Sequence, residues 1–195
     1  MLGMAYENGR GVERDIEKAL EHYRKAAESG YAAAENNLGR MYLAGTGVPK
    51  DTQEAMRLFT ASATQGNAES YFNLALCWLK GCSGAIDATS AYGWYLSGTA
   101  TGTIPPESFR KTFTQIAAEL APEDIKSAQS ASQTWIAQHP AADPHLPIQL
   151  DHVPGIALAM NSQRPTARTE DEVLKTLWQQ TPFTQPLSPN HASAH

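Results

Sequence analysis

Few residues in this chain have the types and spacing that chemistry requires. The run Gly81-Cys82-Ser83-Gly84 places a thiol and a hydroxyl between glycines, as a nucleophile elbow does, but its glycine spacing is wrong and no strand precedes it. His191 and His195 are four residues apart and could share a metal ion, yet their proline-, serine- and alanine-rich segment offers no further ligand. His22 falls on a predicted helix and is expected at the surface. The sequence therefore predicts no catalytic residue, no cofactor and no metal site.

Cys77 and Cys82 are the two cysteines of the chain. They fall at the predicted end of a helix and in the turn after it. A disulfide across five residues at a helix terminus would be strained in most geometries, so two free thiols are expected.

An internal repeat decides where all of these residues lie. Leu2-Gly3-Met4-Ala5-Tyr6 recurs 36 residues later as Leu38-Gly39-Arg40-Met41-Tyr42, and after another 36 as the looser Leu74-Ala75-Leu76-Cys77-Trp78. Further positions keep the same register: Asp15, Asp51 and Asp87; Ala19, Ala55 and Ala91; Gly30, Gly66 and Gly102. A strict period of this size is typical of stacked-repeat proteins, which usually present extended surfaces to partners.

Each repeat is predicted to contain two helices separated by glycine turns. In the second repeat the first helix is expected over 32–44, with Ala34, Leu38, Met41 and Tyr42 on its core face. Glycines at 45 and 47 end it, because glycine adopts the left-handed backbone conformation at little cost. Asp51 then has the spacing of a capping box for a second helix that runs to about residue 65.

Two further sets of positions indicate the core. Positions 3, 39 and 75 hold Gly, Gly and Ala, as expected where two helix backbones cross closely. Positions 23, 59 and 95 hold Tyr, Phe and Tyr, large aromatic residues expected to fill the space between stacked repeats. We interpret both sets as core positions.

This pattern resembles the Sel1-like repeat, a relative of the tetratricopeptide repeat. The resemblance rests on the Leu-Gly-x-x-Tyr-x-x-Gly-x-Gly-Val run at 2–12 and 38–48 and on the Asp-x-x-x-Ala spacing after it. The third copy, within 74–102, departs from the pattern at Ala75 and at 81–84. The resemblance implies an all-α, right-handed α-solenoid of helix–turn–helix repeats over 1–104. It also implies a bacterial scaffold or adapter that binds other proteins.

The ends of the array differ from its middle. The first helix of the first repeat is too short to complete its unit, so upstream repeats or a different start codon are expected, and the compartment, cytoplasm or periplasm, stays open. After Gly102 the period stops. Two helices beginning near Pro106 and Pro122 are expected to cap the array over 105–138. Such an alanine-rich pair also resembles the segment found after Sel1-like arrays in many bacterial proteins, including PodJ-type polar localisation factors.

The segment 139–195 is predicted to be a largely irregular tail. Eight of the twelve prolines lie in it, so no long helix fits. Its exceptions are an apolar stretch at 150–160 and a short helix near 170–180, which begins with a capping box at Thr169 and carries Val173, Leu174, Leu177 and Trp178.

Composition excludes several classes of partner. The net charge is −5 and no lysine or arginine cluster occurs, which argues against binding to nucleic acid or to an anionic membrane. No stretch approaches the ~20 apolar residues of a membrane span. The secreted relatives implied by the resemblance carry a cysteine pair in each repeat, and this chain does not.

A partner-binding groove is predicted on the first helix of each repeat, opposite the core face. In the second repeat this face carries Asn36, Arg40 and Leu43, spaced four and three residues apart. The same positions of the third repeat carry Phe72, Leu76 and Leu79, and those of the first carry Met4 and Glu7. The face therefore changes from polar to apolar along the array.

Two explanations of the apolar end remain open. Either the cap helices cover Phe72, Leu76 and Leu79, or these residues form an anchor pocket for a peptide, and a partial cover would allow both. The chain's own tail is a further candidate occupant. The function that this pattern indicates is a protein–protein interaction scaffold. The alternative is a hydrolase of the β-lactamase-like type proposed for cysteine-rich relatives, against which the missing cysteine pairs and the missing nucleophile–base set argue.

Overall fold

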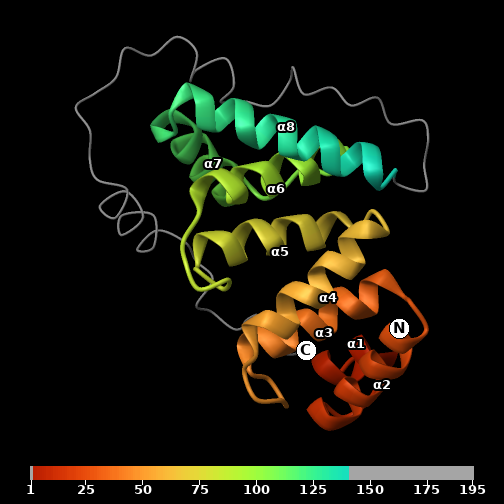
Figure 1. The fold of residues 1–195 in the computed structure, drawn as a ribbon. Coiled ribbons are helices and arrows are strands. Elements are labelled where there is room, and N and C mark those ends of the chain that lie inside the picture. The colour runs from red at the N-terminus through yellow and green to blue at the C-terminus, as the bar shows by residue number, and fades with distance from the viewer. Residues whose placement is uncertain (1, 141–195) are drawn as a thin grey trace, which may run out of the picture.

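The computed structural model describes residues 2–140, and within them it contains helices and no strand. Consecutive helices form antiparallel hairpins that stack along one axis, so this part of the chain is an all-α solenoid (Figure 1). The helices are α1 (Leu2–Asn8), α2 (Ile16–Glu28), α3 (Ala32–Ala44), α4 (Thr52–Thr64), α5 (Ala68–Leu79), α6 (Ala88–Ala100), α7 (Glu107–Glu119) and α8 (Pro122–Gln138). The predicted tail beyond Pro140, with its short helix near 170–180, lies outside the described residues.

The repeated aspartates begin the second helix of each repeat. Asp15, Asp51 and Asp87 have extended backbones and accept hydrogen bonds from amides two or three residues ahead. These bonds satisfy amide groups that have no partner inside the helix. The predicted capping box at Asp51 is half present, because the Glu54 carboxylate pairs with Arg57.

The small and the aromatic positions of the repeat fit each other. A Cβ added to Gly39 would lie 2.8 Å from the ring of Phe59, and one added to Gly3 would lie 2.7 Å from the ring of Tyr23. Both pairs join the two helices of a single hairpin. Both rings also belong to core clusters that contain residues of the following repeat, Tyr23 with α3 and Phe59 with α5, as predicted for rings between stacked repeats.

The core consists of three clusters along the solenoid axis. The first joins α2 and α3 to Leu58 in the middle of α4, and the second lies between α4 and α5. The third joins α5 and α6 to both cap helices. Ala34, Leu38 and Met41 are buried as predicted, whereas Tyr42 is partly buried and packs against the first two clusters.

The two cap helices lie on different sides of α6. Helix α8 runs alongside α6 (Figure 1), and a Cβ on Gly93 of α6 would lie 3.2 Å from the carbonyl oxygen of Ala128 in α8. Helix α7 instead inserts Phe109 and Phe113 between α5 and α6, where Tyr95 stacks on Phe113 at 4.4 Å between ring centroids. The cap therefore closes the last repeat from two sides.

Candidate partner-binding surfaces

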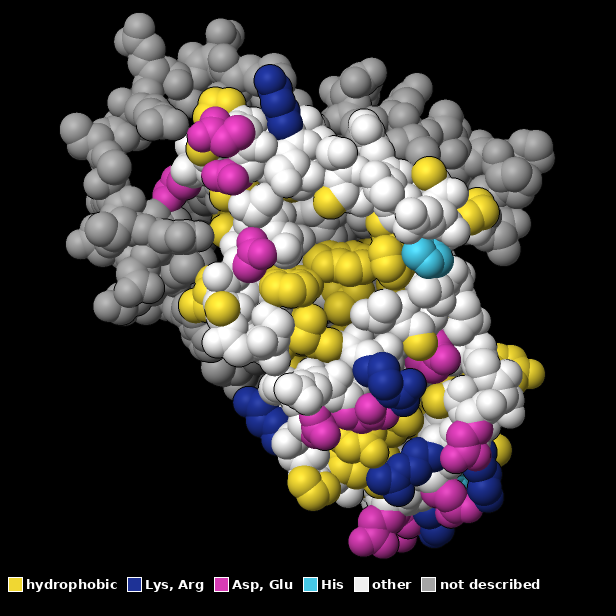
Figure 2. Space-filling model, in the orientation of Figure 1, with side chains coloured by type: hydrophobic (Ala, Val, Ile, Leu, Met, Phe, Trp, Pro, Cys, Tyr) yellow, Lys and Arg dark blue, Asp and Glu magenta, His cyan; other side chains and the backbone are white. Residues whose placement is uncertain are grey.

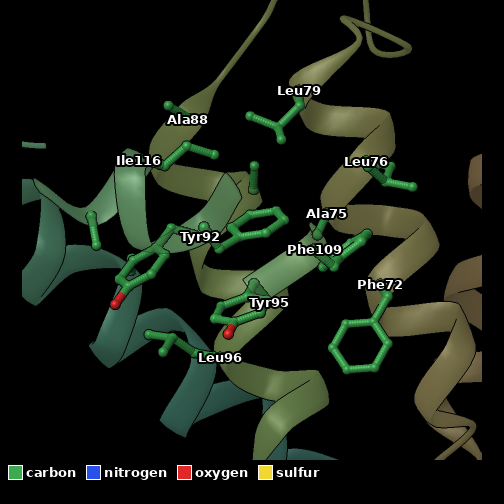
Figure 3. Packing of buried hydrophobic residues seen from close by; sticks show 14 of the residues in the cluster. Phe72, Ala75, Leu76, Leu79, Ala88, Tyr92, Tyr95, Leu96, Phe109 and Ile116 are labelled. Carbon is green, nitrogen blue, oxygen red and sulfur yellow. The ribbon is translucent and has the colours of Figure 1, made fainter. Parts of the chain in front are cut away.

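The apolar end of the predicted groove is closed. Phe72, Leu76 and Leu79 are buried in the cluster that includes Phe109 of α7 (Figure 3). The rings of Phe72 and Phe109 meet edge to face, with 5.4 Å between their centroids. The structure agrees with the first of the two explanations, in which the apolar residues are covered and do not form an open anchor pocket. None of these three residues is available to a partner in this structure.

Asn36 is also inaccessible, with 1% of its surface exposed. Its side-chain oxygen accepts hydrogen bonds from the Ser70 hydroxyl (3.0 Å) and the Asn73 amide (2.8 Å), and its own amide donates to Glu69 (3.1 Å). All of these partners lie on α5. Asn36 therefore joins the second repeat to the third and is not available to a ligand.

Arg40 remains open to solvent on the same helix, with 44% of its side chain exposed. One guanidinium nitrogen donates to the Asn37 side chain at 3.2 Å, and another lies 3.9 Å from a carboxylate oxygen of Glu7. The other oxygen of Glu7 accepts a 2.6 Å hydrogen bond from the Tyr23 hydroxyl. Burial and this carboxylate raise the pKa of Tyr23, so the hydroxyl keeps its proton and Glu7 is held in place.

Two apolar residues lie three positions from this polar group in sequence, Met4 before Glu7 and Leu43 after Arg40. Leu43 is partly buried against the core between α4 and α5, and Met4 on α1 is 43% exposed. The structure therefore brings Arg40, Glu7, Leu43 and Met4 to adjoining first helices of the array. Of the six groove residues predicted from the sequence, Arg40 and Leu43 remain at the surface.

A second surface was not predicted from the sequence. Figure 2 shows a hollow lined with hydrophobic side chains in the middle of one face, between α8 and α4. Met56 of α4, Trp94 of α6 and Trp135 of α8 are partly buried and pack on the core cluster between α4 and α5. The rings of Trp94 and Trp135 meet edge to face with 4.7 Å between their centroids, and the centroids of Trp94 and Tyr71 of α5 are 6.2 Å apart.

Tryptophan is enriched in the energetically important centres of protein interfaces, which was the available signal for this surface. The sequence placed Trp135 in a cap helix and Trp94 in the third repeat, but helical spacing did not indicate that they face each other. Their approach depends on the packing of α8 against α6. Residues 94 and 135 are therefore brought together by tertiary structure alone.

The residues with reactive side chains do not assemble into a site. The Ser83 hydroxyl donates to the carbonyl of Ala85 at 3.3 Å, and His22 stacks on Tyr6 at 5.5 Å between centroids. Within residues 2–140 no three His, Cys, Asp or Glu side chains are grouped so that they could hold a metal ion. His191 and His195 lie outside the described residues. None of the described helices is long and apolar enough to cross a membrane.

Comparison with known proteins identifies the repeat. A family model described as "Sel1 repeat" matches residues 1–31, 32–67 and 68–100, which together make up more than half of the chain. No curated protein matches the sequence.

Two solved structures are similar. A protective antigen of uropathogenic Escherichia coli strains that displays an SLR fold has 24% sequence identity and a TM-score of 0.61, over 86% of this chain and 33% of that one. A Sel1 repeat protein from Oxalobacter formigenes has 25% identity and a TM-score of 0.53, over 70% of this chain and 56% of that one. The chain thus spans about a third and about half of the lengths of these two proteins.

Proposed function

Because the chain belongs to the Sel1 repeat family, whose repeats typically mediate protein–protein interaction, we propose that it binds a peptide or protein partner on the exposed face of α1 and α3. The proposal rests on Arg40. Its guanidinium is half exposed, and at 3.9 Å its contact with Glu7 is too long for a hydrogen bond. A guanidinium has five N–H donors, so several remain for a ligand.

The chemistry of this face selects an acidic ligand. Arginine binds a carboxylate through two parallel hydrogen bonds, which are stronger than bonds between neutral groups. Met4 and Leu43, on the same two helices, offer apolar surface to such a ligand. The partner is therefore a segment with an acidic side chain or a free C-terminal carboxylate next to an apolar residue, bound at about micromolar Kd, or about −8 kcal/mol.

The test is a peptide array presenting the same sequences with a free C-terminal carboxylate, with a C-terminal amide, and with internal acidic residues. Arg40→Glu should lose binding by about tenfold or more, since a hydrogen bond to a charged group contributes about 1.5–3 kcal/mol. Arg24→Glu makes the same change of charge on an exposed side chain of α2, outside the proposed face of α1 and α3, and should bind as the wild type does. Equal binding by all three proteins, or no acidic ligand for the wild type, would refute the proposal.

We propose no hydrolase function for the repeats. Both thiols are buried, and Ser83 makes its hydrogen bond to a backbone carbonyl instead of a base. A serine or cysteine nucleophile needs a base within hydrogen-bond reach. Purified protein should therefore hydrolyse a chromogenic cephalosporin no faster than buffer does, and turnover that survives further purification would establish the alternative.

We propose that Met56, Trp94 and Trp135, which we call the aromatic hollow, form a second interaction surface, and that its occupant is the chain's own segment 173–178. This segment carries Val173, Leu174, Leu177 and Trp178, spaced to give one apolar helical face. The chain leaves α8 close to the hollow, because His139 stacks on Trp135 at 4.0 Å. A tether of about thirty residues reaches the site easily and gives an effective concentration in the millimolar range, so weak contacts suffice.

Hydrogen exchange on three proteins tests this occupant: the full chain, a chain that ends at Pro140, and the full chain with Leu177→Asp. If the segment docks, amides of α8 around Trp135 should exchange faster in the truncated chain and in Leu177→Asp than in the unmodified full chain. Identical exchange in all three would show that segment 173–178 does not occupy the hollow. Because Arg40 lies elsewhere, this result would leave the first proposal intact.

A further inference from the structure

The turn after α5 brings the two cysteines of the chain together. The amide of Cys82 donates a 2.9 Å hydrogen bond to the carbonyl of Cys77, and the amide of Gly81 donates to Trp78 at 3.3 Å. Gly81 has φ 64°, in the left-handed region. This is the Schellman arrangement at a helix C-terminus, in which the side chains at the positions of Cys77 and Cys82 commonly contact each other.

The same turn occurs in the other two repeats with different side chains. The amide of Thr46 donates to Met41 and that of Arg10 to Ala5, both at 2.9 Å, and Gly45 and Gly9 adopt positive φ as Gly81 does. The backbone therefore does not require cysteine at these positions. In the third repeat both contacting positions hold cysteine, and both belong to one buried cluster.

We propose that Cys77 and Cys82 form an oxidisable thiol pair, which a small disulfide such as glutathione disulfide converts to an intramolecular disulfide. The turn places the two residues at positions whose side chains commonly touch, and both lie in one buried cluster. The turn holds the two residues together without help from the rest of the fold.

The two sulfurs have different roles because their environments differ. Cys82 is 9% exposed and Cys77 is fully buried, so an oxidant in solution meets Cys82 first. The hydrogen bond from Cys77, with the positive charges of Lys80 and Lys50, lowers the pKa of Cys82 to about 7. The same contact and burial raise the pKa of Cys77, which keeps its proton until the second step.

The reaction proceeds by two thiol–disulfide exchanges. The Cys82 thiolate attacks one sulfur of glutathione disulfide, whose S–S bond breaks, and one glutathione leaves as a thiolate that takes up a proton. Cys77 then loses its proton to solvent, and its sulfur attacks the Cys82 sulfur and releases the second glutathione. In total the two protein thiols lose two protons and two electrons, and one glutathione disulfide becomes two glutathiones.

The position of the pair connects its redox state to the array. The Thr52 hydroxyl, at the start of α4, donates a 3.2 Å hydrogen bond to the carbonyl of Cys82. The turn that carries the cysteines therefore touches the second repeat as well as the third. Oxidation changes the side chains at this contact between repeats.

The experiment uses the reduced full chain exposed to glutathione disulfide under native conditions, followed by denaturation, alkylation and mass measurement. The wild type should lose two hydrogens and carry no alkyl group. Cys77→Ala should retain one bound glutathione, because nothing displaces it, and Cys82→Ala should stay unmodified until it is unfolded. Circular dichroism of each variant confirms that it has folded.

The pH dependence gives a second readout. The rate of the first exchange should rise with pH through an apparent pKa below that of an ordinary thiol in the wild type, and this pKa should shift upward in Cys77→Ala, which lacks the Cys77 thiol. A wild type that remains fully alkylated, that keeps bound glutathione, or that forms linked dimers instead of the internal bridge would overturn the proposal.

Discussion

Asn36 in α3 and Phe72 in α5 stand one repeat apart, and each faces the first helix of the next unit along the chain. Asn36 binds Asn73 and Ser70 through hydrogen bonds, whereas Phe72 packs against the ring of Phe109. Asn73 and Phe109 are themselves 36 residues apart. The two junctions therefore use the same pair of positions, with polar side chains between repeats and aromatic side chains between the last repeat and the cap.

A third repeat position also differs between the polar and the aromatic junction. The hydroxyl oxygens of Ser62 in α4 and Ser70 lie 2.7 Å apart in the polar junction, and the counterpart of Ser62 36 residues later is Gly98 of α6. A Cβ on Gly98 would lie 2.6 Å from the ring of Phe72. Glycine is needed there because the aromatic ring occupies the space that a side chain would fill.

The contrast shows two ways to join helix pairs. A fully hydrogen-bonded buried network favours one arrangement of its members, because any other leaves polar groups without partners. An aromatic junction instead stabilises through burial of apolar surface and edge-to-face contact, which depend less on direction. Repeats thus continue through a polar junction and the array ends at an apolar one.

The largest effect should come from the aromatic junction. Phe72→Ala is expected to cost about 3–5 kcal/mol of unfolding free energy, as for other buried phenylalanines. Urea unfolding measures it, with Phe72→Leu as the control that keeps most of the volume. A loss below about 1 kcal/mol would mean that α7 does not depend on this contact.

Substitutions that convert the polar junction into the aromatic type test whether residues 36 and 62 depend on each other. Asn36→Phe alone should destabilise by roughly 1–3 kcal/mol, because the ring meets Ser62 and displaces the hydrogen bonds. Addition of Ser62→Gly should recover part of the lost unfolding free energy, with a coupling energy of about 1 kcal/mol between the two substitutions in a double-mutant cycle. Strictly additive effects would show that Ser62 and Gly98 are not equivalent partners of residues 36 and 72.

The N-caps should respond alike in both repeats, since both aspartates have an extended backbone and accept a hydrogen bond from the amide three residues ahead. Asp51→Ala and Asp87→Ala are each expected to cost about 1 kcal/mol. Thermal unfolding of the two variants gives the comparison. A difference as large as the effect itself would indicate that the looser third repeat uses its cap differently.

The smallest expected effect concerns Glu35, which receives a 2.8 Å hydrogen bond from Gln65. Burial raises the pKa of Glu35, so the folded state binds more protons than the unfolded state, and this residue lowers stability as pH rises above the usual carboxyl range. Glu35→Gln keeps an acceptor for Gln65 and should remove that part of the pH dependence. Unfolding free energies of the two proteins should therefore diverge as pH rises, with the variant the more stable, and parallel curves would contradict this.

Much of the repeat could be predicted from particular residues. The bounds of α3, the caps at Asp51 and Asp87, the turn at Gly45 and the helix that begins at Pro122 depend on local chemistry, since a cap or a glycine turn involves neighbours in sequence. The family could be recognised for the same reason, because its pattern consists of such local requirements. The small residue at Gly39 and the buried ring at Phe59 were both predicted, but the sequence did not show that the ring lies against that glycine.

The surfaces could not be predicted in the same way. Helical periodicity placed Arg40 and Leu76 on one face, but it carries no information about which element covers that face. Only the packing of α7 on α5 decided that Leu76 is buried while Arg40 stays exposed. Likewise, the pairing of Trp94 with Trp135 depends on α8 lying along α6. Sequence by itself determined the helices and their ends through contacts a few residues apart, whereas burial depends on distant segments and was decided by the tertiary structure.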